Sequence, residues 1–242
     1  MRVSKAERTT DLLGRIDKDF SNPAALFRAK PFWAWNGELE PGELRRQVRV
    51  MHRMGLGGFF MHSRVGLATP YLSQEWFDCV EACIDEAKKL GMEAWMYDED
   101  RWPSGAAGGL VTRGPKHRMR YLAVTKLERA AQLKWQKNTL AAFTARLDDV
   151  KAMATEVVQV PKGKRPKLPA GHTLLVFTLE IMGDSSWYNG AAYLDTLSHD
   201  AVKAFIQSTH EAYRKAVGKH FGGTVPGMFT DEPNHGDTIA RG

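Results

Sequence analysis

The sequence lacks the segments that hold a chain in a membrane or carry it out of the cell. It contains no run of about 18 apolar residues, so no membrane-spanning helix is predicted. Residues 1–20 are polar and charged, and they include no apolar segment of the kind found in a secretory leader. We therefore expect a cytoplasmic protein with no membrane partner.

Cysteine is scarce, and the motifs of common cofactors are absent. The two cysteines, Cys79 and Cys83, lie on a predicted helix, where a metal ion would need further ligands that the surrounding sequence does not offer. There is no Walker loop, no Gly-x-Gly-x-x-Gly after a strand and no nucleophile elbow. The residues by themselves predict reduced thiols and no cofactor.

Basic residues outnumber acidic ones, but not in the pattern of a nucleic-acid-binding protein. The sequence has 34 Lys and Arg against 28 Asp and Glu, a formal net charge of +6. These residues are spread along the chain, and the densest group, at 162–167, lies in a loop with proline and glycine. We interpret the charge as a solvated surface and expect no nucleic-acid partner.

The first hundred residues alternate between two kinds of hydrophobic pattern. After a polar lead-in over residues 1–30, short apolar runs alternate with helical patterns, in the order 31–37, 41–54, 57–62, 73–90 and 92–98. Continuous apolar strands that alternate with helices indicate an α/β protein with a parallel sheet.

The alternation changes between residues 120 and 182. Runs of period two, separated by turn residues, predict a small antiparallel β insertion. A helix is then predicted over 194–221, and a fourth parallel strand over 227–233.

Polar or charged side chains follow each of the four predicted parallel strands. Because the carboxyl ends of parallel strands meet at one edge of the sheet, we expect these side chains to gather there. A single acidic run would be interpreted as a solvated turn, whereas four such strand ends indicate a site. The strand ends are Trp35-Asn36, His62-Ser63-Arg64, Asp98-Glu99-Asp100 and Asp231-Glu232.

These residue types suit a carbohydrate ligand. Aromatic rings pack against the C–H faces of sugars, and carboxylates accept hydrogen bonds from sugar hydroxyls. Trp35 and Trp102 border polar strand ends and are the predicted platform. Glycosidase carboxyls stand about 5–5.5 Å apart for retention or about 6.5–9.5 Å for inversion. Since Asp231 and Glu232 point to opposite faces of one strand, the partner of either must come from another strand.

Other interpretations of the same residues stay open. His62 is either a hydrogen-bonded core histidine or a binding residue. Arg64 either pairs with Asp98 or Glu99 or contacts a ligand. A divalent-metal hydrolase that uses His62, Asp98 and Asp231 is a further alternative, as is a carbohydrate-binding remnant without activity.

Four ordered segments carry a resemblance to a known family. They read PFWAWNG at 31–37, GGFFMHSRVGL at 57–67, YDEDRWPSG at 97–105 and FTDEP at 229–233. Together they resemble the N-terminal catalytic region of the α-L-rhamnosidases of glycoside hydrolase family 106. The resemblance implies hydrolysis of O-glycosidic bonds, with α-L-rhamnosides as expected substrates. It also implies an incomplete TIM-like (β/α) barrel of about four parallel strands over residues 31–242, interrupted by the β insertion at 120–182.

The resemblance also implies roles for individual residues. In barrel glycosidases the acid/base glutamate often follows the fourth strand, which assigns the general acid to Glu232. Asp98 or Asp100 would supply the second carboxyl group. Calcium near the sugar is associated with the family, but the sequence contains no calcium loop. The residues expected to bind substrate are Trp35, Asn36, His62, Arg64, Glu99, Arg101, Trp102 and Asp231.

Proteins of that family are much longer than this chain. A whole barrel needs about 200–250 residues without insertions. We therefore expect a catalytic-domain fragment whose glycosidase activity requires the remaining barrel strands, and which associates with itself through the open edge of its barrel.

Overall fold

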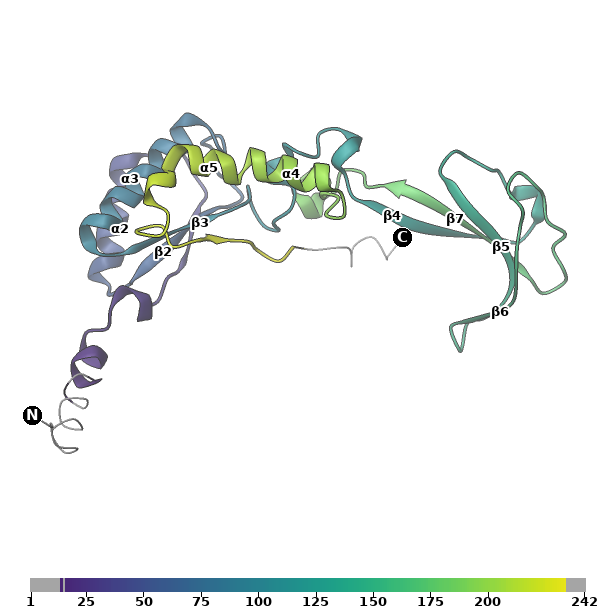
Figure 1. The fold of residues 1–242 in the computed structure, drawn as a ribbon, viewed down its shortest axis with the longest axis horizontal. Helices are drawn as coiled ribbons and strands as arrows, with labels where there is room; N and C mark the ends of the chain where they lie inside the picture. The colour runs from purple at the N-terminus through teal and green to yellow at the C-terminus, as the bar shows by residue number, and fades with distance from the viewer. Residues whose placement is uncertain (1–13, 15, 234–242) are drawn as a thin grey trace, which may run out of the picture.

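The computed structural model describes residue 14 and residues 16–233, which form two sheets (Figure 1). The parallel sheet consists, in spatial order, of β1 (Phe32–Trp35), β2 (Gly58–Ser63), β3 (Glu93–Tyr97) and β8 (Met228–Phe229). The antiparallel sheet consists, in spatial order, of β4 (Arg120–Leu127), β7 (Thr173–Ile181), β5 (Thr139–Asp148) and β6 (Met153–Gln159). The expected mixed α/β architecture is confirmed in this form, and the described residues close no barrel.

Capping residues define where α2 (Pro41–Arg53) and α3 (Gln74–Leu90) begin and where α3 ends. The side chain of Glu40 accepts hydrogen bonds from the first amides of α2, and Pro41 occupies its first turn. Ser73 accepts from the amide of Trp76 and so caps α3. Gly91 ends α3 in the left-handed conformation, with φ 66°.

The single helix expected over 194–221 is wrong. The chain instead forms α4 (His199–Ser208) and α5 (His210–Val217), followed by the 3-10 turn η6 (Gly218–His220). Ser198 caps α4, which fixes the later start. At the break, the hydroxyl of Ser208 donates to the carbonyls of Ala204 and Phe205, a local bond that competes with the regular helical pattern.

The main core lies between the parallel sheet and its helices. α2, α3 and α5 cover one face of the sheet (Figure 1). Trp35, Phe59 and Met61 project from the strands into this core, where they meet Trp76 of α3. The indole N–H of Trp76 donates to the Tyr213 hydroxyl at 3.2 Å, so its one polar atom is satisfied within the core.

The opposite face of the parallel sheet carries an aromatic cluster. The register aligns Phe32 with Phe60, and Phe60 with Trp95, so their side chains share this face. Phe229 completes the cluster, with its ring centroid 4.9 Å from that of Phe32. Phe32 is 52% exposed on the edge strand, so this face presents aromatic surface to solvent.

The antiparallel sheet has a small core of its own and extends away from the α/β layer (Figure 1). Leu133, Ala142, Val160, Leu174 and Val176 are buried together there.

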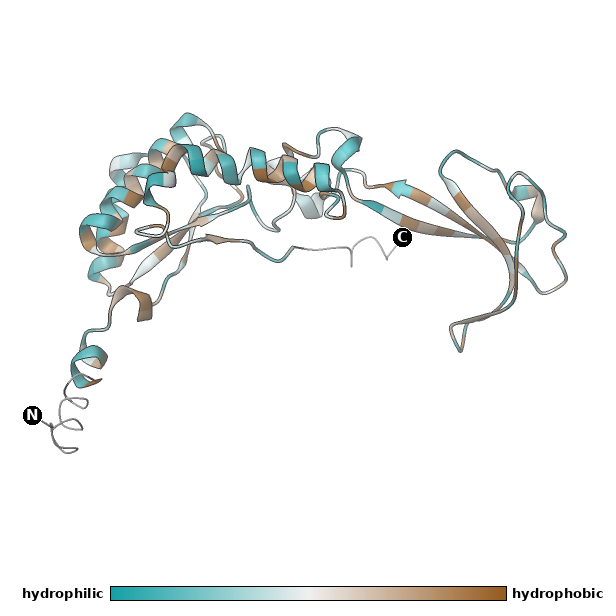
Figure 2. Ribbon diagram, viewed as in Figure 1, coloured by the Kyte–Doolittle hydropathy of each residue, from teal (hydrophilic) through white to brown (hydrophobic). Residues whose placement is uncertain are grey.

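The helices carry both polar and apolar residues. Hydrophilic and hydrophobic residues are interspersed along α3 (Figure 2), and no helix among the described residues is long and apolar enough to cross a membrane.

Two glycines provide a test of the sheet packing. A Cβ at Gly58 would lie 2.4 Å from the carbonyl oxygen of Glu93 on the neighbouring strand, whereas a Cβ at Gly37 would meet nothing within 4 Å. We expect Gly58→Ala to lower the free energy of unfolding by about 1–3 kcal/mol. Gly37→Ala should leave it unchanged within about 0.5 kcal/mol. Urea unfolding of both variants measures the difference, and equal stability would contradict this packing.

Candidate active site

Three side chains meet at the carboxyl ends of β2, β3 and β8. The hydroxyl of Tyr97 donates to Asp231 Oδ2 at 2.8 Å. The Nε2 atom of His62 lies 3.6 Å from the same oxygen, and the His62 and Tyr97 ring centroids are 3.8 Å apart. The convergence of strand ends therefore brings His62 and Asp231 together. Tyr97 joins them from the end of β3, which lies between β2 and β8 in the sheet.

Burial sets the protonation behaviour of this group. His62 is 3% exposed, and burial lowers its pKa, assisted by Arg64 and opposed by Asp231. Burial raises the pKa of Tyr97, and its bond to Asp231 raises it further. Near neutral pH, Tyr97 is therefore a hydrogen-bond donor beside the Asp231 carboxyl group.

Asp98 connects the two strands that form the site. Its Oδ1 atom accepts from the Ser104 hydroxyl at 2.6 Å, and its Oδ2 atom accepts from the Thr230 hydroxyl. Ser104 Oγ in turn accepts from the Asp231 amide at 2.9 Å. Asp98 is 1% exposed, and burial raises its pKa while the two hydroxyls lower it. In this arrangement its carboxylate joins β3 to β8.

Glu99 holds the loop that follows β3. Its carboxylate accepts hydrogen bonds from the amide of Asp100 and from four successive amides over residues 105–108. Such a ring of backbone donors is an anion-binding concavity, here filled by the protein's own side chain. Burial raises the pKa of Glu99 to about 7, against the lowering effect of these amides.

Asp100 is engaged in the same loop. Its Oδ1 atom accepts from the Ser63 hydroxyl at 2.6 Å, and its Oδ2 atom lies 3.0 Å from Nη2 of Arg101. The three consecutive carboxylates thus bind three different sets of partners within the chain. Together they fix the conformation of the segment that carries Trp102.

Glu232 and Trp102 form a second, more exposed part of the site. The indole N–H of Trp102 donates to Glu232 Oε2 at 3.1 Å. Glu232 has φ 42°, so the strand alternation that the sequence analysis extended to it ends before it. The ring of Trp187 packs edge-on against Trp102, with the centroids 5.0 Å apart.

The remaining predicted residues lie in different surroundings. Trp35 is 2% exposed on the helix-covered face, with its ring against Trp76. Asn36 and Arg64 are exposed after β1 and β2. The structure therefore brings His62 and Asp231 together and Trp102 beside Glu232, while Trp35 belongs to the main core.

Sequence reasoning did not identify two residues of this region. Tyr97 was included in an apolar run. It is the last residue of that run and directly precedes Asp98, so its hydroxyl could have been expected to lie among the polar strand ends. Trp187 stands in the 3-10 turn η5 (Ser186–Tyr188), and no pattern in the sequence connects it with Trp102.

The described residues contain no group of three or more His, Cys, Asp or Glu side chains arranged for a metal ion. Asp98 points to Ser104 and Thr230, and not to the shared oxygen of Asp231 that His62 approaches. The alternative of a metal-dependent hydrolase built on these three residues therefore has no geometric support from this arrangement.

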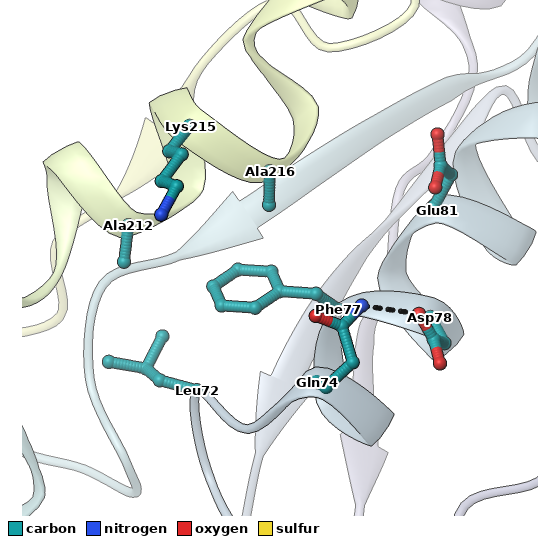
Figure 3. Close-up of a pocket in the computed structure, with 8 residues that line it drawn as sticks. All are labelled: Leu72, Gln74, Phe77, Asp78, Glu81, Ala212, Lys215 and Ala216. Carbon is teal, nitrogen blue, oxygen red and sulfur yellow. Dashed lines mark hydrogen bonds between the residues drawn. The ribbon is translucent and has the colours of Figure 1, made fainter.

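A pocket of about 440 Å³ lies elsewhere, between α3 and α5 (Figure 3). Phe77 projects into it, Lys215 borders it on α5, and Asp78 and Glu81 border it on α3. Its lining includes no residue that the sequence analysis assigned to catalysis or binding. We therefore locate the candidate site at the strand ends and not in this groove.

The fold is similar to that of a solved protein described as a rhamnosidase from Novosphingobium sp. PP1Y. The TM-score is 0.56 at 13% sequence identity, over 89% of this chain and 39% of the rhamnosidase chain. The chain thus spans well under half of the length of that protein. No protein-family model and no curated protein matches the sequence. At this identity the likeness establishes a related fold.

Ser104 provides a test of the connection between β3 and β8. Removing its hydroxyl would leave Asp98 Oδ1 and the amide of Asp231 without these partners, so Ser104→Ala should lower the free energy of unfolding by about 2 kcal/mol. Ser186→Ala, at an exposed position, is the control and should have no effect. Equal unfolding midpoints for the two variants would show that this connection contributes nothing to stability.

Proposed function

We propose that this chain is part of the catalytic region of a glycoside hydrolase, with α-L-rhamnosides as its substrates. The observation that carries the proposal is the meeting of polar groups at the carboxyl ends of β3 and β8. There Asp231 lies against Tyr97 and His62, and Glu232 lies against Trp102. The likeness of the fold to that of a solved rhamnosidase and the resemblance of the four sequence segments to family 106 support the same proposal.

The architecture supports a partial barrel. β1, β2, β3 and β8 pair in parallel, and their order in the sheet is their order along the chain. Helices cover one face of this sheet. In a (β/α) barrel the opposite face would be the interior, and the catalytic residues would lie at the carboxyl ends of the strands. The aromatic cluster of Phe32, Phe60, Trp95 and Phe229 corresponds to one side of such an interior.

Glu232 is the proposed general acid. Its side chain is exposed at the edge of the site, where it can approach a glycosidic oxygen, and the Trp102 indole orients it. Asp231, with Tyr97 and His62, would bind the hydroxyls of the sugar. Asp98 and Asp100 are held within the loop, so we assign the second carboxyl group to a strand of the completed barrel.

The role of Glu232 can be tested in the enzyme that contains the complete barrel. Glu232→Gln should abolish hydrolysis of rhamnosides with poor leaving groups and spare rhamnosides of an activated phenol, because only the former need a proton donor. Steady-state kinetics on both substrate types measures this difference. Glu128→Gln, a change at an exposed residue just after β4, is the control and should retain both activities.

Other outcomes distinguish the alternatives. Equal loss on both substrates would remove Glu232 from the acid role. Binding of rhamnosides without hydrolysis by the completed protein would favour a carbohydrate-binding remnant, and hydrolysis sensitive to chelators would favour a metal-dependent enzyme.

The open sheet face leads to a second prediction. The exposed Phe32 on edge strand β1 should allow copies of this chain to associate through the aromatic face. Light scattering should show a mass that rises with protein concentration, and Phe32→Glu should lower it. Leu197→Glu, at a residue that is 95% exposed, should not. A wild-type chain that stays a monomer would contradict the prediction.

A further inference from the structure

We propose that Trp102 and Trp187 bind a pyranose ring of the leaving group, on the side of the scissile bond that Glu232 protonates. This inference rests on the proposed glycosidase function and adds a subsite to it. It assigns a role to Trp187, which lies more than eighty positions along the chain from Trp102 but contacts its ring.

The two indoles form an open aromatic corner. Their ring centroids are 5.0 Å apart and their planes meet at 67°, so each ring leaves a face available that the other does not cover. Trp187 is 41% exposed, which is unusual for the largest apolar side chain. The C–H face of a pyranose packs on such a ring while its hydroxyls stay in water or bond to nearby polar groups.

The corner is held in place before any ligand binds. The Asn189 side-chain amide donates to the backbone carbonyl of Trp102 at 3.1 Å. Ser185 caps η5 by accepting from the amide of Trp187, and Tyr188, 1% exposed, anchors the same turn in a buried cluster. Because both rings are preorganised, a sugar would lose little binding energy to ordering them.

The position of Glu232 determines which sugar the corner would hold. The indole N–H of Trp102 bonds to the carboxyl group that we propose as the general acid. A general acid protonates the oxygen of the leaving group, so a ring packed on Trp102 approaches Glu232 from the leaving-group side. The rhamnosyl ring, on the other side of the scissile bond, would lie closer to His62, Tyr97 and Asp231.

A polar pocket adjoins this corner through Asn189. It has a volume of about 360 Å³, and Gly108, Gly109 and Arg113 form part of its wall. This size lies within the range of ligand sites. The pocket gives a longer saccharide space beyond the sugar that packs on Trp187.

Binding measurements on the chain test the inference. We would titrate it with methyl α-L-rhamnoside and with a disaccharide in which rhamnose is linked to glucose. The additional ring should make the disaccharide bind about tenfold more tightly, the affinity change that corresponds to ~1.4 kcal/mol of aromatic packing. Trp187→Ala should remove that gain and leave the affinity for methyl α-L-rhamnoside unchanged.

Two further variants serve as controls. Trp187→Phe should restore most of the gain, because it keeps an aromatic face. Phe27→Ala, at another exposed aromatic residue, should leave both affinities unchanged. Equal affinity for both ligands, or a gain that survives Trp187→Ala, would overturn the subsite while the proposed function stands. Failure of both ligands to bind would overturn the proposed function and the subsite with it.

Discussion

The site depends on the hydrogen bonds that connect β3 to β8. β8 pairs with β3 through only two residue positions, so backbone pairing alone fixes its end weakly. The Asp98 carboxylate accepts hydrogen bonds from the hydroxyls of Ser104 and of Thr230, which directly follows β8. Ser104 in turn accepts a hydrogen bond from the amide of Asp231. These bonds set where Asp231 and Glu232 emerge from the sheet. Because both oxygens of the buried Asp98 carboxylate accept hydrogen bonds, it holds the two strand ends in a fixed position. Without these bonds, burying the charged group would cost free energy.

Neighbouring carboxylates serve different purposes because their surroundings differ. Asp98 and Glu99 are each 1% exposed and bind hydroxyls or amides of the chain. Asp231 keeps a partly exposed side chain against Tyr97, and Glu232 is exposed beside an indole. The first two thus shape the loop and join the strands, and Asp231 and Glu232 are the carboxyl groups that we propose meet a ligand.

The parallel strands and the first two helices could be predicted because apolar periodicity is a local property of the sequence. The role of each carboxylate could not be predicted. Glu99, for example, accepts hydrogen bonds from backbone amides six to nine positions further along the chain, and only the folded loop brings these amides to it. The same limit applies to Trp187, which reaches Trp102 through tertiary structure. The break at Thr209 follows from a side-chain bond of Ser208 that hydrophobic spacing does not reveal.

The most direct test of a carbohydrate site at these strand ends is NMR of the tryptophan indole N–H groups during titration with methyl α-L-rhamnoside. The indole of Trp102 bonds to Glu232 at the site, that of Trp33 bonds to Gln47, and that of Trp76 bonds to Tyr213 in the core. We expect a saturable shift of the Trp102 signal, with the Trp33 and Trp76 signals unmoved. If the sugar shifts another signal until that shift saturates, and the Trp102 signal does not move, the account is contradicted.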